Sequence, residues 1–252
     1  MKLGLSRREL LASTGAALGA VIVTGTASRT TLGAEGKTGP RWGIAVDIAR
    51  CGNQSGCRAC IDACHAAHRV PQIEDARHQV KWVWKEAFAR VFPEQTHGWE
   101  TDAHQQAPVL VLCNHCAKSP CTKVCPTGAT WRRSDGVVAM DEHRCIGCRY
   151  CMAACPYEAR SFNWVDPHPS PNPGNYPART AGVVEKCNLC VERIDNGQIP
   201  LCVETCTGTG AGALTFGNLE DASSPLRRLL ATRQVLRRRP ALGTEPRIFY
   251  LV

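Results

Sequence analysis

The sequence predicts an α+β chain in which two cysteine-rich modules intertwine, with loop insertions and a short leader in front of them. Three observations support this prediction. Sixteen cysteines in 252 residues fall into four groups of four, and every group contains a C-x2-C pair. Short apolar segments with strand character lead into the groups. The stretches AVDIARC (residues 45–51) and AMDEHRC (residues 139–145) match at alanine, aspartate and arginine, which indicates a duplicated strand–loop–helix unit.

The leader resembles an export signal. Arg7 and Arg8 precede a mildly apolar stretch, residues 10–27, and small residues follow it. This pattern predicts that residues 1–34 are a twin-arginine signal peptide, a type that exports folded proteins, so we expect a periplasmic location. An ordinary secretion signal remains an alternative, and so does a retained anchor, because about 20 apolar residues span a bilayer.

The segments between and around the cysteine groups set the order of the domains. Residues 35–107 contain the first cysteine group and an insertion in which Trp82 and Trp84 indicate a strand with buried rings. We expect this segment to pair with the fourth cysteine group, in residues 181–220. A central module of residues 108–165 holds the second and third groups.

Two further segments complete the chain. Five prolines in residues 166–180 indicate a surface linker. Residues 221–252 are basic, and we expect a strand at their end. The spacing of leucines and valine predicts a helix over residues 225–239, with arginines around its apolar face.

The third cysteine group has the most specific spacing, C-x2-C-x2-C-x3-C-P, in CIGCRYCMAACPYEA. In two-cluster ferredoxins the first three thiolates of such a run hold one [4Fe–4S] cluster, and the fourth reaches the other cluster. We expect Gly147 to let the backbone approach the inorganic sulfur and Pro156 to open the first turn of a helix. The fold predicted is therefore two bacterial-ferredoxin-like dicluster modules.

The same exchange of the fourth ligand between paired groups, the second with the third and the first with the fourth, predicts four [4Fe–4S] clusters. The four ligand sets are here called the first to fourth centres. The first centre comprises Cys51, Cys57, Cys60 and Cys206. The second comprises Cys64, Cys187, Cys190 and Cys202. The third comprises Cys113, Cys116, Cys121 and Cys155. The fourth comprises Cys125, Cys145, Cys148 and Cys151.

The wide gap between Cys51 and Cys57 is interpreted as an insertion in a working motif. The AVDIARC repeat aligns Cys51 with Cys145, the first ligand of the third group. The extra residues lie in GNQSG, whose glycines and small polar residues suit an exposed loop.

Other uses of the cysteines are less consistent with the pattern. Zinc ribbons combine two separated C-x2-C pairs, and they give no reason for a compact four-ligand run followed by proline. A disulfide-bonded adaptor without metal is a further alternative, but the twin-arginine signal and the recurring C-x2-C pairs argue against it. Four histidines lie near the cysteines, and we expect them behind the ligands or at the surface: His65, His68, His115 and His143.

The formal net charge of +8 suggests an acidic partner such as nucleic acid, but its distribution argues against one. The net positive charge lies at the two ends: residues 1–34 carry +3 and residues 227–247 carry +6, which leaves about −1 for the middle of the chain. Clusters held by four thiolates are anionic and would cancel most of the apparent basicity. We expect no nucleic-acid partner.

These motifs resemble the four-cluster electron-transfer subunits of membrane redox complexes, the small subunits of polysulfide, tetrathionate and dimethyl-sulfoxide reductases. The segments VLCNHC, GVVEKCNLCVER and GTEPRIFYLV also look like the exported iron–sulfur subunit of the Dsr transmembrane complex (DsrO type) of sulfur-metabolising prokaryotes. The resemblance covers residues 41–220 best.

The resemblance implies a periplasmic subunit that relays electrons in dissimilatory sulfur metabolism. Its implied partners are an integral quinone-interacting subunit of the polysulfide-reductase type, a multihaem cytochrome c and other subunits of a Dsr-like complex. The electron-transfer subunit of a molybdopterin-type reductase is the alternative. An enzyme with a substrate-binding cluster is also open, and it would require a cluster with one cysteine too few, as when Cys51 is not a ligand.

Overall fold

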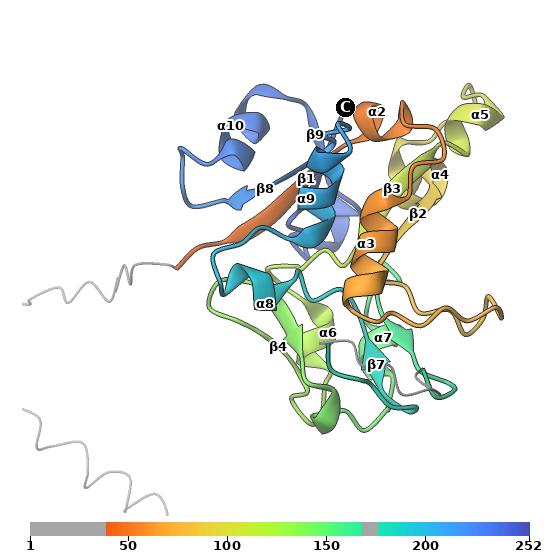
Figure 1. The fold of residues 1–252 in the computed structure, drawn as a ribbon. Helices are drawn as coiled ribbons and strands as arrows, with labels where there is room; N and C mark the ends of the chain where they lie inside the picture. Colours follow the sequence, from red (N-terminus) through yellow and green to blue (C-terminus); the bar gives the residue numbers. More distant parts are fainter. Residues whose placement is uncertain (1–38, 168–175) are drawn as a thin grey trace, which may run out of the picture. The chain divides into compact units, whose positions relative to one another are not determined.

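The computed structural model describes residues 39–167 and 176–252 (Figure 1). The predicted signal peptide with Arg7 and Arg8, and the middle of the proline-rich segment, lie outside these residues. Within the described residues, no helix has both the length and the apolar character needed to cross a membrane.

The largest sheet has four strands in the order β8-β1-β10-β9. Their bounds are Leu214–Asn218 for β8, Trp42–Asp47 for β1, Ile248–Leu251 for β10 and Val235–Leu236 for β9. The central strand β1 runs parallel to β10, with Ile44 opposite Ile248, and antiparallel to β8. Apolar side chains on both faces of β1 are buried, which explains its continuous apolar run rather than an alternating pattern.

In the described part of the chain, three two-stranded antiparallel sheets support the cysteine loops. They pair β2 (Val83–Ala87) with β3 (Pro108–Leu112), β4 (Thr130–Arg132) with β5 (Val138–Met140), and β6 (Ser161–Phe162) with β7 (Val184–Glu185). The strands predicted before the cysteine groups are therefore present. Trp82 is 1 % exposed, as predicted, whereas Trp84 is only half-buried.

The α-helices of the described residues are short, and the longest, α3, spans nine residues. The α-helices near the first and fourth cysteine groups are α2 (Ile48–Gly52), α3 (Ala59–Ala67), α8 (Val191–Ile194) and α9 (Leu201–Gly208). Those of the insertion and central module are α4 (Phe88–Val91), α5 (Asp102–Gln105), α6 (Pro120–Lys123) and α7 (Tyr150–Ala153). The 3₁₀ helices of the described residues are η1 (Pro93–Gln95), η2 (Glu142–Arg144) and η3 (Pro240–Leu242). Helices α3 and α9 pack side by side, which joins the first cysteine group to the fourth (Figure 1).

The internal repeat has a structural role in both copies. Asp47 precedes α2, and its carboxylate accepts a hydrogen bond from the Arg50 amide at 2.9 Å. Asp141 precedes η2 and accepts one from the His143 amide at 2.9 Å. An aspartate at this position satisfies an amide that the helix start leaves unpaired. In each copy the aspartate thus marks the change from a strand to a short helical segment, and the first cysteine of the group lies in or directly after that segment.

The C-terminal helix is shorter than predicted. Helix α10 (Pro225–Thr232) ends where Arg233 adopts an extended conformation. Val235 and Leu236 then form β9, which pairs with β10. The apolar residues expected on a helical face are used in the sheet instead, because strand pairing at the edge of β10 outweighs local helical periodicity.

A buried ion pair ties distant segments together. Arg179, near the end of the proline-rich segment, meets Glu185 at 2.8 Å, and both side chains are almost wholly buried. Glu185 also accepts hydrogen bonds from the Trp82 indole and the Asn163 amide. Arg179 in turn donates to the backbone oxygen of His68 at 2.7 Å. The end of a segment predicted to lie at the surface is therefore part of the interior.

Candidate metal centres

The cysteines predicted for the first centre surround one small cavity. Cys51 lies in α2, Cys57 and Cys60 flank the start of α3, and Cys206 comes from α9. The amide of Ala213 donates a hydrogen bond to the Cys206 sulfur at 3.3 Å. Residues 52–56 are exposed, as the interpretation of an inserted loop predicts.

The thiols of the first centre act on one another electrostatically. Burial, with added repulsion from the thiolates of Cys206 and Cys51, raises the pKa of Cys60 to about 12. Burial also raises the pKa of Cys51, although the ammonium of Lys85 opposes this. Several thiolates that are partly buried and repel one another require a neighbouring positive charge, which the iron ions of a cluster supply.

The cysteines predicted for the second centre are all buried. Burial and the nearby thiolates of Cys187 and Cys202 raise the pKa of Cys64 well above its usual value. The segment with Cys187 and Cys190 bends sharply, with positive φ at Leu189 and Cys190. The Leu189 amide is 3.4 Å from the Cys187 sulfur, a hydrogen bond of the kind that raises cluster potentials.

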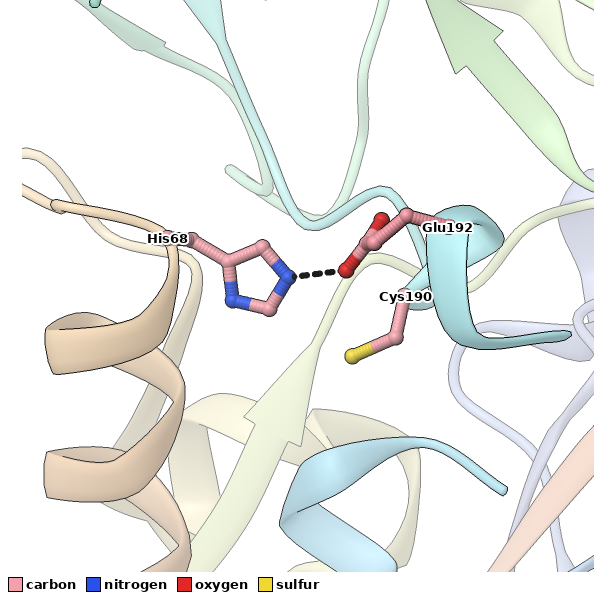
Figure 2. A group of neighbouring side chains, drawn as sticks. All are labelled: His68, Cys190 and Glu192. Carbon is pink, nitrogen blue, oxygen red and sulfur yellow. Dashed lines mark hydrogen bonds and ion pairs between the residues drawn. The ribbon is translucent and has the colours of Figure 1, made fainter. Parts of the chain in front are cut away.

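His68 connects α3, which carries Cys64, to α8, which follows Cys190 (Figure 2). Its Nδ1 is 2.9 Å from the Cys64 backbone oxygen, and its Nε2 is 2.8 Å from Glu192 on α8. The ring packs against Trp82 and Tyr176, which also contact each other. His68, Cys190 and Glu192 place ligand atoms within 4.8 Å of one another, a distance that could also suit a single metal ion. Cys190 belongs to the predicted four-thiol set and His68 is already bonded to Glu192, so we place His68 behind the ligands.

The cysteines predicted for the third centre line another cavity, together with Tyr157 and Arg160. Burial and the Cys113 thiolate raise the pKa of Cys116 to about 12. Arg160 is 5 % exposed. Burial alone would lower the pKa of Arg160, but the thiolates of Cys121 and Cys151 raise it. The positive charge of this guanidinium therefore acts on thiolates of both the third and the fourth centre.

The cysteines predicted for the fourth centre line a cavity near the surface, with Ile146 and Arg149. Only Cys151 of the four is buried. Burial would raise the pKa of Cys125, but hydrogen bonds from the backbone of Thr130 and from Thr127 lower it. Exposed apolar side chains surround this centre, among them Ile146 and Tyr150, which are 67 % and 62 % exposed.

One expectation about the third group needs correction. Pro156 lies in a turn after α7 has ended, so it does not open a helix. Pro126 occupies the same place after α6, which makes this turn a feature of both central groups. Gly147 has a φ of +69°, and a Cβ there would collide with the Gly182 backbone oxygen. The glycine is required by its conformation and by this neighbour in the protein.

The histidines near the cysteines differ in position. His68 and His115 are each 1 % exposed, and His65 is half-buried. The His115 Nδ1 accepts a hydrogen bond from the Val138 amide at 3.1 Å. The side chain of His143 is 92 % exposed. The expectation that they lie behind the ligands or at the surface is consistent with these positions.

Sequence reasoning missed the cations beside the thiols. Lys85 acts on Cys51 and Arg160 on Cys113 and Cys121, all distant in sequence, whereas Lys186 directly precedes Cys187. Lys186 donates to the backbone oxygens of Val138 and Cys187 in the interior. No local motif marks these residues, although an arginine or lysine next to a cysteine-rich run is a usable signal.

All sixteen cysteines lie in the described residues, and none of them forms a disulfide. Residues 109–219 match the model of a protein family described as a 4Fe-4S dicluster domain. Over 98 % of its length the chain is 40 % identical to an Hdr-like menaquinol oxidoreductase iron-sulfur subunit 1 from Archaeoglobus fulgidus, of which 97 % is covered. The chain belongs to the family of [4Fe–4S] dicluster iron–sulfur subunits.

Other members of this family span most of the chain. A tetrathionate reductase subunit from Salmonella typhimurium is 34 % identical, over 86 % of this chain and 74 % of its own length. Protein NrfC from Escherichia coli is 33 % identical, over 97 % of this chain and 94 % of its own length. In a family of this kind, sixteen cysteines are the complement of four [4Fe–4S] clusters.

Proposed function

We propose that the chain is the electron-transfer subunit of a membrane-bound quinol oxidoreductase complex, with the four predicted cysteine sets as its cluster ligands. A [4Fe–4S] cluster supplies a site that takes up and releases one electron. The residues of the chain hold each site, exclude water from the inner ones and place hydrogen bonds and cations beside the sulfurs, which tunes their potentials.

One observation carries the proposal: the four sets form a series of electrostatic neighbours. Cys60 of the first set acts on Cys202 of the second. Cys113 of the third acts on Cys187 of the second. Cys121 of the third acts on Cys151 of the fourth. The first and fourth sets, at the two ends of the series, are also the ones with several half-exposed cysteines. A chain of sites open at both ends suits passage of electrons between two partners.

The finer proposal concerns the complex. The likeness of the Dsr-type segments supports a periplasmic subunit exported by the twin-arginine pathway and active in dissimilatory sulfur metabolism. Its partners would be a quinone-interacting membrane subunit and a multihaem cytochrome c. A molybdopterin-type polysulfide, tetrathionate or dimethyl-sulfoxide reductase is the second candidate, favoured by the identity with the tetrathionate reductase subunit.

Anaerobic purification of the native complex tests both levels. About 16 irons and 16 sulfides per chain, with EPR signals from several interacting clusters on reduction, are expected. Haem without molybdenum in the complex supports the Dsr-type assignment, and molybdenum supports the reductase. Zinc in place of iron, or far fewer irons, contradicts the four-cluster proposal.

A further inference from the structure

A groove lies beside the first centre, between α3, residues 71–81 and β2. Its volume is about 600 Å³ and it is partly open to solvent. Pockets of about 300–1,000 Å³ commonly hold ligands. None of the sixteen cysteines lines this groove, so it is separate from the metal centres.

The groove is positively charged. Arg58, Lys81 and Lys85 line it, with Glu74 as the opposing carboxylate. Arg58 is paired with Asp62 at 3.5 Å, on the exposed side of α3. Lys81 and Lys85 are half-buried. Within the described part of the chain the Lys81 ammonium has no ion pair or hydrogen bond, whereas Lys85 also acts on the Cys51 thiol of the first centre. Half-buried ammoniums that have lost part of their hydration favour an anion beside them.

We propose that this groove docks an acidic, extended segment of a partner subunit. Side-chain carboxylates of such a segment would pair with Lys81 and Lys85. A small oxoanion would fill only a small part of this space. The aliphatic lining, which includes Ile61, Ile73 and Val80, suits apolar side chains between the acidic ones.

The position of Lys85 connects this docking site to electron transfer. Lys85 lines the groove and also the cavity of the first centre. A carboxylate that pairs with Lys85 would offset the positive charge facing that centre. The docking itself extends the proposed function, and its test below does not depend on electron transfer, so the two can fail separately.

Lysine acetylation under anaerobic conditions is the first test. The holoprotein is labelled alone and within its native complex, and the labelled sites are quantified by mass spectrometry. We expect Lys81 and Lys85 to be labelled in the isolated chain and protected in the complex. Lys123, which is exposed and lies outside the groove, is the internal control. Carbodiimide cross-linking of the complex should then join Lys81 or Lys85 to an aspartate or glutamate of one partner subunit.

Charge-removing variants provide the second test. Lys81→Gln with Lys85→Gln should weaken retention of the subunit by the complex by roughly tenfold or more, because charge-assisted contacts are lost. Lys123→Gln should leave it unchanged. Unaltered iron content and visible absorbance verify that each variant is folded. Equal labelling of both lysines in the isolated chain and the complex overturns the proposal. Protection by millimolar sulfate in the isolated chain, with no further protection in the complex, also overturns it and identifies a small-anion site.

Discussion

The second and fourth centres use similar ligands in opposite surroundings. All four cysteines of the second centre are buried, and Cys64, Cys187 and Cys202 belong to the main hydrophobic core. Burial and mutual repulsion raise the pKa of Cys64 and Cys202 well above the usual range. In the fourth centre only Cys151 is buried, and hydrogen bonds lower the pKa of Cys125.

This difference shows that the cysteine ligands have different structural roles at the two centres. At the second centre, most of the ligands are also core residues, so metal binding and packing stabilise one another. At the fourth centre, the loop after Cys125 supplies its own hydrogen bonds to the sulfur, and the ligands lie close to solvent. We therefore expect damage at the second centre to affect the whole fold and damage at the fourth to remain local.

The largest effect is expected for Cys202→Ser. It removes a ligand from the interior and buries a hydroxyl among thiolates, and a structural metal site contributes on the order of 10 kcal/mol. Most of the protein should be insoluble or lack the iron of more than one cluster. Cys148→Ser, in the fourth centre, should stay soluble and lose only about four irons. Iron analysis and anaerobic thermal unfolding compare them, and equal losses would contradict the distinction.

Arg179→Met should be next in size. It leaves the Glu185 carboxylate buried without its cation and removes the hydrogen bond to the His68 backbone behind the second centre. Breaking such a buried pair costs about 3–5 kcal/mol. Arg77→Met breaks an exposed pair with Asp75 and should change the free energy of unfolding far less, because exposed ion pairs are screened by solvent. Denaturant unfolding measures both, and a small effect of Arg179→Met would show that the network is dispensable.

Gly147→Ala probes the loop of the fourth centre. The left-handed conformation costs a residue with a Cβ about 1–2 kcal/mol, and contact with the Gly182 oxygen adds to this. Gly182→Ala is the matched control, because it has a φ of +85° but open space around its Cβ. The EPR signal of one cluster should change in Gly147→Ala while the unfolding midpoint falls modestly. Equal EPR spectra and unfolding midpoints in the two variants would show that the contact between residue 147 and the Gly182 oxygen is unimportant.

The smallest effect is expected at the surface of the fourth centre. The Arg149 guanidinium lies 4.8 Å from the ring centre of Trp164 and 5.4 Å from that of Phe162. Exposed cation–π contacts contribute about 0.5–1 kcal/mol, so Arg149→Gln should change the free energy of unfolding by that amount. All four clusters should remain. A loss of iron in this variant would mean that the outer loop depends on the contact more than its exposure indicates.

Local spacing predicted much of the site. The C-x2-C pairs, the strands before the groups and the exposed loop after Cys51 follow from short stretches of sequence, because a tight loop around a metal centre is itself local. The repeat in the sequence also marks Asp47 and Asp141, whose side chains cap the following helical segments. Periodicity failed at Val235 and Leu236, where a strand formed elsewhere in the chain offered a better partner than the preceding helix.

Contacts between distant segments could not be predicted in this way. Arg160 reaches thiols of two cysteine groups, and Arg179 crosses from the proline-rich segment to the backbone at His68. Nothing near either arginine in the sequence distinguishes it from the many exposed arginines of the chain. Only the folded arrangement shows which cations offset the charge of the interior.

The position of β1 has a consequence for the synthesis of this protein. Both of its neighbours, β8 and β10, lie far downstream of β1 in the sequence. Non-local pairing of this kind is slow to form, so β1 lacks its sheet partners until those two strands have been synthesised. A chain that stops short of Ile248 would lack the parallel partner of β1, and we expect its first cysteine group to be more exposed to oxidation and to chaperones.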